Sequence, residues 1–254
     1  MSAWAPDHPD AEVVPSPNFG PRIGVTVPDM IILHYTGMET GEGAQNWLCN
    51  PESQVSSHYL VHEDGRIVQM VRESERAWHA GKSFWAGATD INSRSVGIEI
   101  VNPGHILGYS DFPAVQIAAV IRLCRGIVAR YGVFAERILA HSDIAPGRKV
   151  DPGEKFPWKT LCDEGLGRFP IPAHIGVDFV LRAGDSGESV QNLQSLLARY
   201  GYNIEITGNF DAATETVVTA FQRHFQPERV NGQADATSVQ ILKTLVGRTG
   251  SDIA

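Results

Sequence analysis

The chain of 254 residues lacks several features that mark whole classes of protein. No apolar run approaches the roughly 20 residues that a membrane-spanning helix needs. Lys and Arg number 21 against 29 Asp and Glu, so the basic surplus typical of nucleic-acid binders is missing. The first residues, MSAWAPDHPD, hold neither a basic stretch nor an apolar core. We therefore expect no secretory signal and a cytoplasmic location, with the periplasm as the alternative.

Cysteine is also scarce. The three cysteines, Cys49, Cys124 and Cys162, are scattered and form no C-x-x-C pair. The pattern therefore indicates neither a cysteine-based zinc site nor a disulfide framework. Cys124 lies on the apolar side of a helical pattern, and we expect it in the core.

Periodic patterns in the first two thirds of the chain alternate between strand and helix. The apolar run 30–33, the two runs around Asp64-Gly65 and the alternating SVGIEIV at 95–101 predict strands. Residues 113–132 predict an amphipathic helix, and RILAH predicts a short strand that ends at His141. The fold class is therefore α/β, with a mixed central sheet flanked by helices.

Composition divides the chain into four segments. Residues 1–27 are rich in proline and predict a lead-in on the surface, and 28–165 form the α/β domain. Residues 166–178 contain Gly and Pro without a clear period and predict a linker. Residues 179–248 hold three helical patterns, which predict a small three-helix domain. Gly208, Asp211 and Thr214 recur as Gly232, Asp235 and Ser238, which indicates a repeated turn and capped helix.

Two histidines and an aspartate suggest a metal site. His34 and His141 each follow a predicted strand, and Asp151 lies in the loop HSDIAPGRKVDPG that begins at His141. A catalytic zinc ion needs three such ligands and an open fourth position. The alternative, that these are ordinary hydrogen-bonded histidines, has about equal weight on this pattern alone.

Charged residues nearby suit hydrolytic chemistry. Glu99 lies in the middle of a predicted strand, on the side opposite Ile98, where it can act as a general base; the alternative is an exposed strand glutamate. Lys149 can stabilise an oxyanion beside a metal. Arg148 can hold a substrate carboxylate or sugar oxygen by paired hydrogen bonds.

Five blocks between Pro15 and Leu161 resemble the zinc N-acetylmuramoyl-L-alanine amidases of the amidase-2 type. They are LHYTG, SSHYLVHEDGRIVQMV, RAWHAG, NSRSVGIEI and AHSDIAPGRKVDPG, in the order of the family. This family shares its fold with peptidoglycan recognition proteins. The segments at Leu193, Gly208 and Ala220 resemble a three-helix peptidoglycan-binding domain.

The resemblance implies a set of roles. One zinc ion would be held by His34, His141 and Asp151, with Glu99 as the catalytic carboxylate and Lys149 as the catalytic cation. The reaction would be hydrolysis of the amide between the lactyl group of N-acetylmuramic acid and L-alanine, in peptidoglycan or in anhydro-muropeptides. The alternative is a non-catalytic peptidoglycan recognition protein. Candidate substrate contacts are Arg148, Trp78, His79, His58, Asn92 and Ser142. The sequence assigns no oligomeric state.

Overall fold

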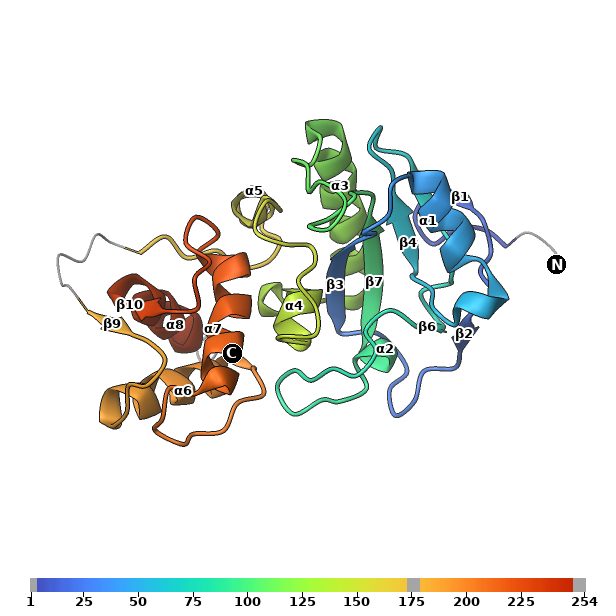
Figure 1. The fold of residues 1–254 in the computed structure, drawn as a ribbon. Helices are drawn as coiled ribbons and strands as arrows, with labels where there is room; N and C mark the ends of the chain where they lie inside the picture. Colours follow the sequence, from blue (N-terminus) through green and yellow to red (C-terminus); the bar gives the residue numbers. More distant parts are fainter. Residues whose placement is uncertain (1–3, 173–178, 249–254) are drawn as a thin grey trace.

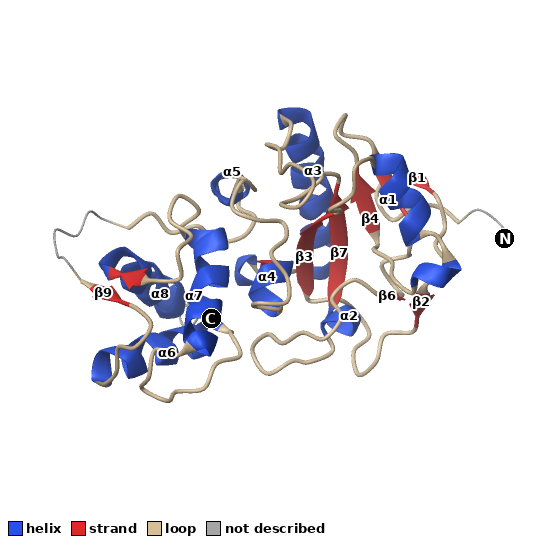
Figure 2. Ribbon diagram, viewed as in Figure 1, coloured by secondary structure: helices blue, strands red, loops and turns tan. Residues whose placement is uncertain are grey.

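A computed structural model describes residues 4–172 and 179–248. A six-stranded sheet forms the centre of the larger part, and a group of helices lies beside it (Figure 1). The strand order is β1-β5-β4-β7-β3-β8. The bounds of these strands are β1 Ala11–Val13, β3 Met30–Tyr35, β4 Tyr59–Val61, β5 Ile67–Gln69, β7 Ser95–Ile100 and β8 Ile138–Ala140. Figure 2 shows the same view by secondary structure.

The sheet is mixed, as predicted. Strands β4 and β5 form an antiparallel hairpin, and Gly65 in its turn has a φ of 86°, a conformation that favours glycine. The pairs β4–β7, β7–β3 and β3–β8 are parallel. A second sheet of two short strands pairs β2 (Phe19–Gly20) with β6 (Arg76–Ala77).

The lead-in differs from the expectation. Its residues Ala11–Val13 form β1, which pairs in parallel with β5 and becomes an edge strand of the main sheet. The segment therefore belongs to the fold and does not merely lie on the surface. Its strand is only three residues long and half exposed, so it has no apolar pattern that the sequence could reveal.

Helices cover the sheet on both sides. Helix α3 (Ala114–Tyr131) packs Val120, Leu123 and Ile127 against Ile31, Leu33 and the other side chains of one sheet face. Cys124 lies in this core, as expected, and burial raises the pKa of its thiol to about 12. The remaining helices of this part are α1 Gly41–Leu48, α2 Ile91–Arg94, α4 His141–Ile144 and α5 Trp158–Asp163, with single turns at Pro51–Ser53 and Ala135–Arg137.

The three predicted helices of the C-terminal part are present as α6 (Glu188–Tyr200), α7 (Ala212–Phe225) and α8 (Ala236–Arg248). The repeated turn is built as the sequence pattern indicates. Asp211 accepts a hydrogen bond from the backbone N–H of Thr214, and Asp235 accepts one from that of Ser238. Two short strands, β9 (Val180–Leu181) and β10 (Ala234–Asp235), pair beside the helices.

The two parts share one apolar core. The second face of the main sheet, with Met30 and Ile32, belongs to the same cluster of buried side chains as Leu197 and Phe221 of the C-terminal helices. The predicted linker is only partly separate: Leu166 packs into the core beneath α3, and 173–178 lie outside the described residues. Within the described ranges, no helix has the length and apolar character to cross a membrane.

Candidate metal centre

Three side chains that the sequence singled out converge at one end of the sheet. His34 lies in β3, His141 is the first residue of α4 directly after β8, and Asp151 lies in the following loop. The Nδ1 atoms of His34 and His141 are 2.9 Å apart, and Asp151 Oδ2 lies 3.0 Å and 2.9 Å from them. All three residues are buried. His141 thus begins a one-turn helix and does not end a strand.

Hydrogen bonds identify the protonated nitrogen of each ring. His141 Nε2 lies 3.2 Å from the carbonyl oxygen of Ala80, so this nitrogen carries the hydrogen. On the other ring, His34 Nε2 faces His79 Nδ1 at 3.0 Å, and His79 Nε2 faces Ser95 Oγ at 3.2 Å. Because Ser95 donates its own hydrogen to the carbonyl of Ile91, the chain runs from His34 Nε2–H to His79 and from His79 Nε2–H to Ser95.

This assignment leaves both Nδ1 atoms as lone-pair acceptors facing a carboxylate oxygen. Three acceptors within 3.0 Å of one another repel unless a cation lies between them. Two imidazoles and one carboxylate, with the other ring nitrogens bonded to outer groups, are the donor set that a catalytic zinc ion prefers. The residues therefore fit a metal ion.

The ionisation of the group agrees with this arrangement. Burial, reinforced by His141, lowers the pKa of His34 to about 4, so the ring is neutral near neutral pH. Burial alone would raise the pKa of Asp151; its lowering comes from His141 and His34 when they are charged and donate from Nδ1, the place that a bound cation would take when both rings are neutral. The carboxylate is thus charged and the imidazole is free to bind a cation.

Glu99 stands beside His34 on the neighbouring strand. The two residues are register partners in the parallel pair β3–β7, so their side chains leave the same face of the sheet. Glu99 lines a cavity of about 420 Å³ together with His141 and Asp151. Its Oε2 is buried and has no hydrogen-bond partner among the described residues. Burial, with the charge of Asp151, raises the pKa of Glu99 well above its ordinary value, although Lys149 acts in the opposite direction.

The loop between the second and third candidate ligands supplies two cations with different surroundings. Lys149 lines the same cavity, beside Glu99 and Asp151. Arg148 also reaches the cavity, but its guanidinium donates to backbone carbonyls, that of Ala80 at 2.6 Å and that of Lys82 at 3.0 Å. These two hydrogen bonds use two of the five N–H donors of the guanidinium and connect Arg148 to the segment 80–82.

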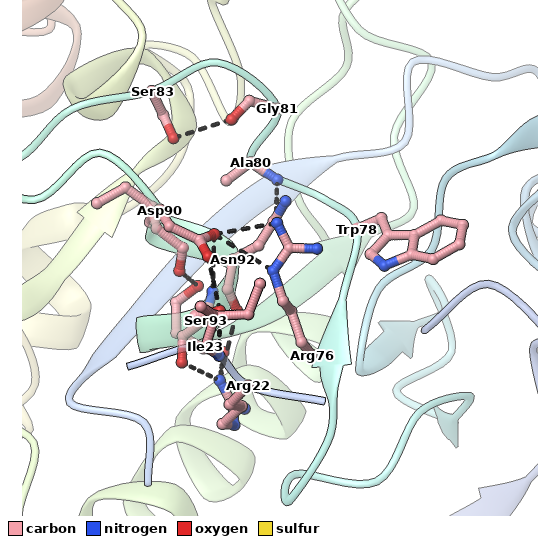
Figure 3. A network of polar contacts seen from close by, with 12 residues as sticks. Arg22, Ile23, Arg76, Trp78, Ala80, Gly81, Ser83, Asp90, Asn92 and Ser93 are labelled. Atoms are coloured by element: carbon pink, nitrogen blue, oxygen red, sulfur yellow. Dashed lines mark hydrogen bonds and ion pairs between the residues drawn. The ribbon is translucent and has the colours of Figure 1, made fainter. Parts of the chain in front are cut away.

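Asn92 holds the segment that carries His79. Its Oδ1 accepts hydrogen bonds from the backbone N–H groups of His79 (3.0 Å) and Ala80 (2.8 Å). Asp90, close by, accepts from Arg76 and Ser93, and the backbone carbonyl of Ser93 accepts from Arg22 (Figure 3). Asn92 is buried and does not line the cavity, so its contacts are those of a support for His79.

His58 and Ser142 are also outside the cavity lining. The Nδ1 of His58 accepts from the backbone N–H of Gly97, and its Nε2 donates to the carbonyl of Glu75. Burial, followed by the charge of Arg22, lowers the pKa of His58 to about 3. Ser142 is fully buried, and its backbone N–H donates to the carbonyl of Asp151. The contacts of both residues are internal.

Aromatic side chains contribute to the lining of the cavity. Trp78, which the sequence pointed to, lines it, and so do Trp47 of α1 and Tyr35 of β3, which the sequence analysis did not single out. Trp47 is 49% exposed. The short helix around it has a modest apolar pattern, and no local signal distinguishes a cavity tryptophan from an ordinary surface one. The place of Trp47 becomes visible only in the folded chain, where it lines the same cavity as Tyr35 of β3.

A mixed sheet with a His-His-Asp group that could hold a metal ion, a buried carboxylate and a lysine in one cavity has the features of a hydrolase. The chain belongs to the N-acetylmuramoyl-L-alanine amidase family: residues 24–154 match the model described as "N-acetylmuramoyl-L-alanine amidase". Residues 186–242 match the model of a "Putative peptidoglycan binding domain".

Known relatives cover different shares of the chain. It is similar to the N-acetylmuramoyl-L-alanine amidase AmiD of Escherichia coli, with 38% identity over 91% of this chain and 85% of that protein. A solved complex of AmiD with the substrate anhydro-N-acetylmuramic acid-L-Ala-D-gamma-Glu-L-Lys has a TM-score of 0.77, 37% identity, and covers 91% of this chain and 93% of that one. The 1,6-anhydro-N-acetylmuramyl-L-alanine amidase AmpD of Salmonella typhimurium is 34% identical over 59% of this chain and 87% of that protein.

Proposed function

We propose that this protein is a zinc-dependent amidase that hydrolyses the bond between the lactyl group of N-acetylmuramic acid and L-alanine of the stem peptide. The observation that carries the proposal is the convergence of three acceptor atoms beside Glu99, in a cavity with room for a substrate. The names of the relatives support the choice of bond. The complex of AmiD contains an anhydro-muropeptide, so we propose that peptidoglycan or its anhydro-muropeptide fragments are the substrate.

His34, His141 and Asp151 would hold the zinc ion. When bound, zinc supplies Lewis acidity, which lowers the pKa of water and polarises a carbonyl group. The carbonyl of Ala80 and the ring of His79 fix the two imidazoles, so that both Nδ1 lone pairs point to one place.

Glu99 would act as the general base. An oxygen with no partner and a raised pKa is suited to accept a proton from the attacking water. The protonated carboxyl would then return this proton to the nitrogen of L-alanine as the amide bond breaks. The same raised pKa makes the carboxyl hold the proton long enough for that transfer.

Lys149 would stabilise the negative charge that develops on the carbonyl oxygen in the transition state. Lys149 lines the cavity together with Asp151 and Glu99, which supports this role, because a cation near the developing charge stabilises the transition state. A fixed cation there contributes most when the cavity is closed to water.

The remaining candidate residues divide between direct contact and support. We propose that Trp78 packs against the sugar, since its ring lines the cavity and an aromatic face suits a pyranose ring. His79 and Arg148 line the cavity. His79 also contacts the ring of His34, and Arg148 donates to the carbonyl of Ala80, which accepts a hydrogen bond from His141. Asn92, His58 and Ser142 support the site from behind it.

Mass spectrometry of digested muropeptides tests the reaction. Incubation of the full chain with zinc and a purified anhydro-muropeptide should release the stem peptide with an intact N-terminal L-alanine. Cleavage within the stem peptide would instead identify a peptidase. Binding without any cleavage would identify the alternative, a non-catalytic recognition protein.

A first prediction concerns the metal. Asp151→Ala removes one of three ligands, and we expect zinc to bind at least about 10-fold more weakly, since a ligand contributes no less than an outer partner does. Elemental analysis after dialysis against a chelator measures this occupancy. A matched control is Glu154→Ala in the same loop, which removes a carboxylate that pairs with His105 and leaves the ligands in place. Equal zinc content in Asp151→Ala and the wild type would contradict the ligand assignment.

We also propose that the enzyme acts in the cytoplasm. All three cysteines are free thiols in the structure, and reducing compartments keep thiols in this state. Fractionation of native cells, with activity assayed on intact sacculi and on soluble muropeptides, tests both the compartment and the substrate form.

A further inference from the structure

A buried carboxylate connects the C-terminal helices to the metal centre. Asp143 is fully buried and accepts three hydrogen bonds. One comes from the backbone N–H of Ala140 (2.9 Å), which directly precedes His141. The other two come from the C-terminal part: the hydroxyl of Tyr202 donates to Oδ1 at 2.6 Å, and Nδ1 of His224 donates to Oδ2 at 2.6 Å.

Asp143 controls the start of the one-turn helix that carries the metal ligand. Its side chain folds back to the N–H at the junction of β8 and α4, so the carboxylate fixes the backbone on one side of His141. Helix α4 lies between the sheet and α7 (Figure 1). A four-residue helix has little stability of its own, so its position depends on such contacts.

The two donors are themselves held in place. The ring of His224 is stacked between the rings of Trp158 and Phe225, with distances between ring centroids of 3.7 Å and 3.8 Å. Tyr202 packs edge-on against Trp85 at 5.0 Å, and its hydroxyl remains protonated because burial and Asp143 raise its pKa well above the usual value. Because both donors are packed against aromatic rings, they hold the carboxylate of Asp143 in one orientation.

A second connection leads to the other side of the same ligand. The backbone N–H of Ala86 donates to the carbonyl of Gly201 in the C-terminal part, and that of Phe84 donates to the carbonyl of Ile144. This loop begins at Ala80, whose carbonyl accepts the hydrogen bond from His141 Nε2. The C-terminal part therefore contacts the loop that follows Ala80 through Gly201, in addition to its contacts with Asp143.

We propose that Tyr202 and His224 are positioning residues for the metal centre, which act through Asp143 on His141. The C-terminal unit would thus serve the chemistry of the site in addition to any contact with the cell wall. The proposal rests on the proposed function only in requiring that His141 binds zinc.

The physical reason is the demand of a buried charge for donors. Without the hydroxyl of Tyr202, Oδ1 of Asp143 loses its hydrogen bond in a region closed to water, and an unsatisfied buried polar group destabilises the arrangement that holds it. The carboxylate can recover this only by turning toward another donor. Such a turn would release the N–H of Ala140 and change the orientation of the His141 ring.

Tyr202→Phe in the full chain tests the proposal. Zinc affinity is measured by competition with a chromophoric chelator, and kcat and KM are measured on an anhydro-muropeptide. We expect zinc to bind about 10-fold more weakly, the lower end of the range for an outer partner of a ligand, and kcat to fall while KM is unchanged. The matched control is Tyr200→Phe, since Tyr200 is also buried against Trp85 but its hydroxyl donates no hydrogen bond to Asp143.

A double-mutant cycle with Asp143→Asn identifies the route. If Tyr202 acts through Asp143, its effect on zinc affinity should be much smaller when the cycle starts from the Asp143→Asn variant. Additive effects would contradict this route. A Tyr202→Phe protein with a lower melting temperature but unchanged zinc affinity and kcat would show that the hydroxyl only stabilises the fold, and would overturn the proposal. Absence of zinc binding by the wild type would instead overturn the proposed function.

Discussion

Glu99 combines two properties that are costly in an ordinary strand residue. One carboxylate oxygen has no partner among the described residues, and the pKa of the group is raised by burial. The unfolded chain releases the proton of this carboxyl near its ordinary pKa, while the folded chain retains it to higher pH. The stability of the folded state therefore falls as pH rises above about 4.5 toward the raised pKa.

This predicts opposite effects of Glu99→Gln on activity and stability. The amide cannot accept a proton, so kcat should fall by about 10²–10⁴-fold, while zinc still binds. The metal-free variant should be more stable than the metal-free wild type at pH 8 by roughly 1–3 kcal/mol, because no charge has to be buried. Steady-state kinetics, elemental analysis and urea unfolding measure the three quantities.

A matched control for this substitution is Glu154→Gln, a partly exposed carboxylate paired with His105. It should change neither kcat nor stability by a comparable amount. Wild-type turnover in Glu99→Gln would remove the general-base assignment. A loss of zinc from that variant would show that Glu99 holds the metal and does not act on water.

Single residues of the site differ in how far the sequence could predict them. His34, His141 and Asp151 were predictable because they stand in motifs whose chemistry needs those side chains. Trp47 and Asp143 were not. The contacts of Asp143 depend on residues far along the chain, since it meets Tyr202 and His224, which follow it by 59 and 81 positions. No local pattern carries that information.

At the scale of elements, the packing of strand β7 fixes a residue next to the metal centre. Its Gly97 lies against the ring of His79, and a Cβ at this position would lie 2.5 Å from His79 Cγ, much closer than real contacts allow. The same ring binds His34 Nε2. The absence of a side chain at Gly97 therefore allows the chain of hydrogen bonds behind His34.

Gly97→Ala should consequently displace His79. We expect a loss of about 1–3 kcal/mol in stability from overpacking and a weaker zinc affinity, because His34 loses its outer partner. Thermal unfolding and chelator competition measure these effects. Gly20→Ala in β2 is the matched control, since a Cβ there meets nothing within 4 Å. Equal zinc affinity in Gly97→Ala and Gly20→Ala would contradict the role of His79 as a support.

Elements with a strong local pattern were predicted well. The hairpin β4–β5, strand β7 and helix α3 follow from alternation, a turn at Gly65 and a helical period that ends at Gly132. Two elements differ from the expectation for a shared reason. β1 is fixed by pairing with β5, and the helical turn at His141 is fixed by Asp143, so both depend on tertiary contacts.

For the whole molecule, buried neutral histidines predict a dependence of stability on pH. Burial lowers the pKa of His58 to about 3, whereas the unfolded chain binds the proton near pH 6.5. Between these values the unfolded state holds more protons, so stability rises with pH and is lost on acidification. One such histidine accounts for about 2 kcal/mol between pH 6.5 and 5. His34 and His79 act in the same direction.

Urea unfolding of the metal-free protein at several pH values measures this slope. His58→Gln should reduce the slope below pH 6.5 by about 1.4 kcal/mol per pH unit, and should leave the slope between pH 7 and 8 unchanged. Glutamine retains a donor and an acceptor for the contacts with Glu75 and Gly97. An identical slope in variant and wild type would mean that His58 has the same pKa in the folded and the unfolded chain.

For the whole molecule, the sequence predicted an α/β unit and a helical unit but not the packing of one against the other. Composition separated an α/β unit from a helical unit, since each has its own periodic pattern. The apolar residues that join them, such as Trp85 and Ile144, lie in loops or short turns where no period exists. A shared core between units cannot be seen until both surfaces are known.

That shared core limits how the protein can be rearranged. A catalytic unit made by ending the chain before α6 would expose Trp85 and Ile144 to water and leave Asp143 without its two outside donors. Exchange of the helical unit for a different module would do the same. In a chimaera built from this protein, the two units should therefore be kept together.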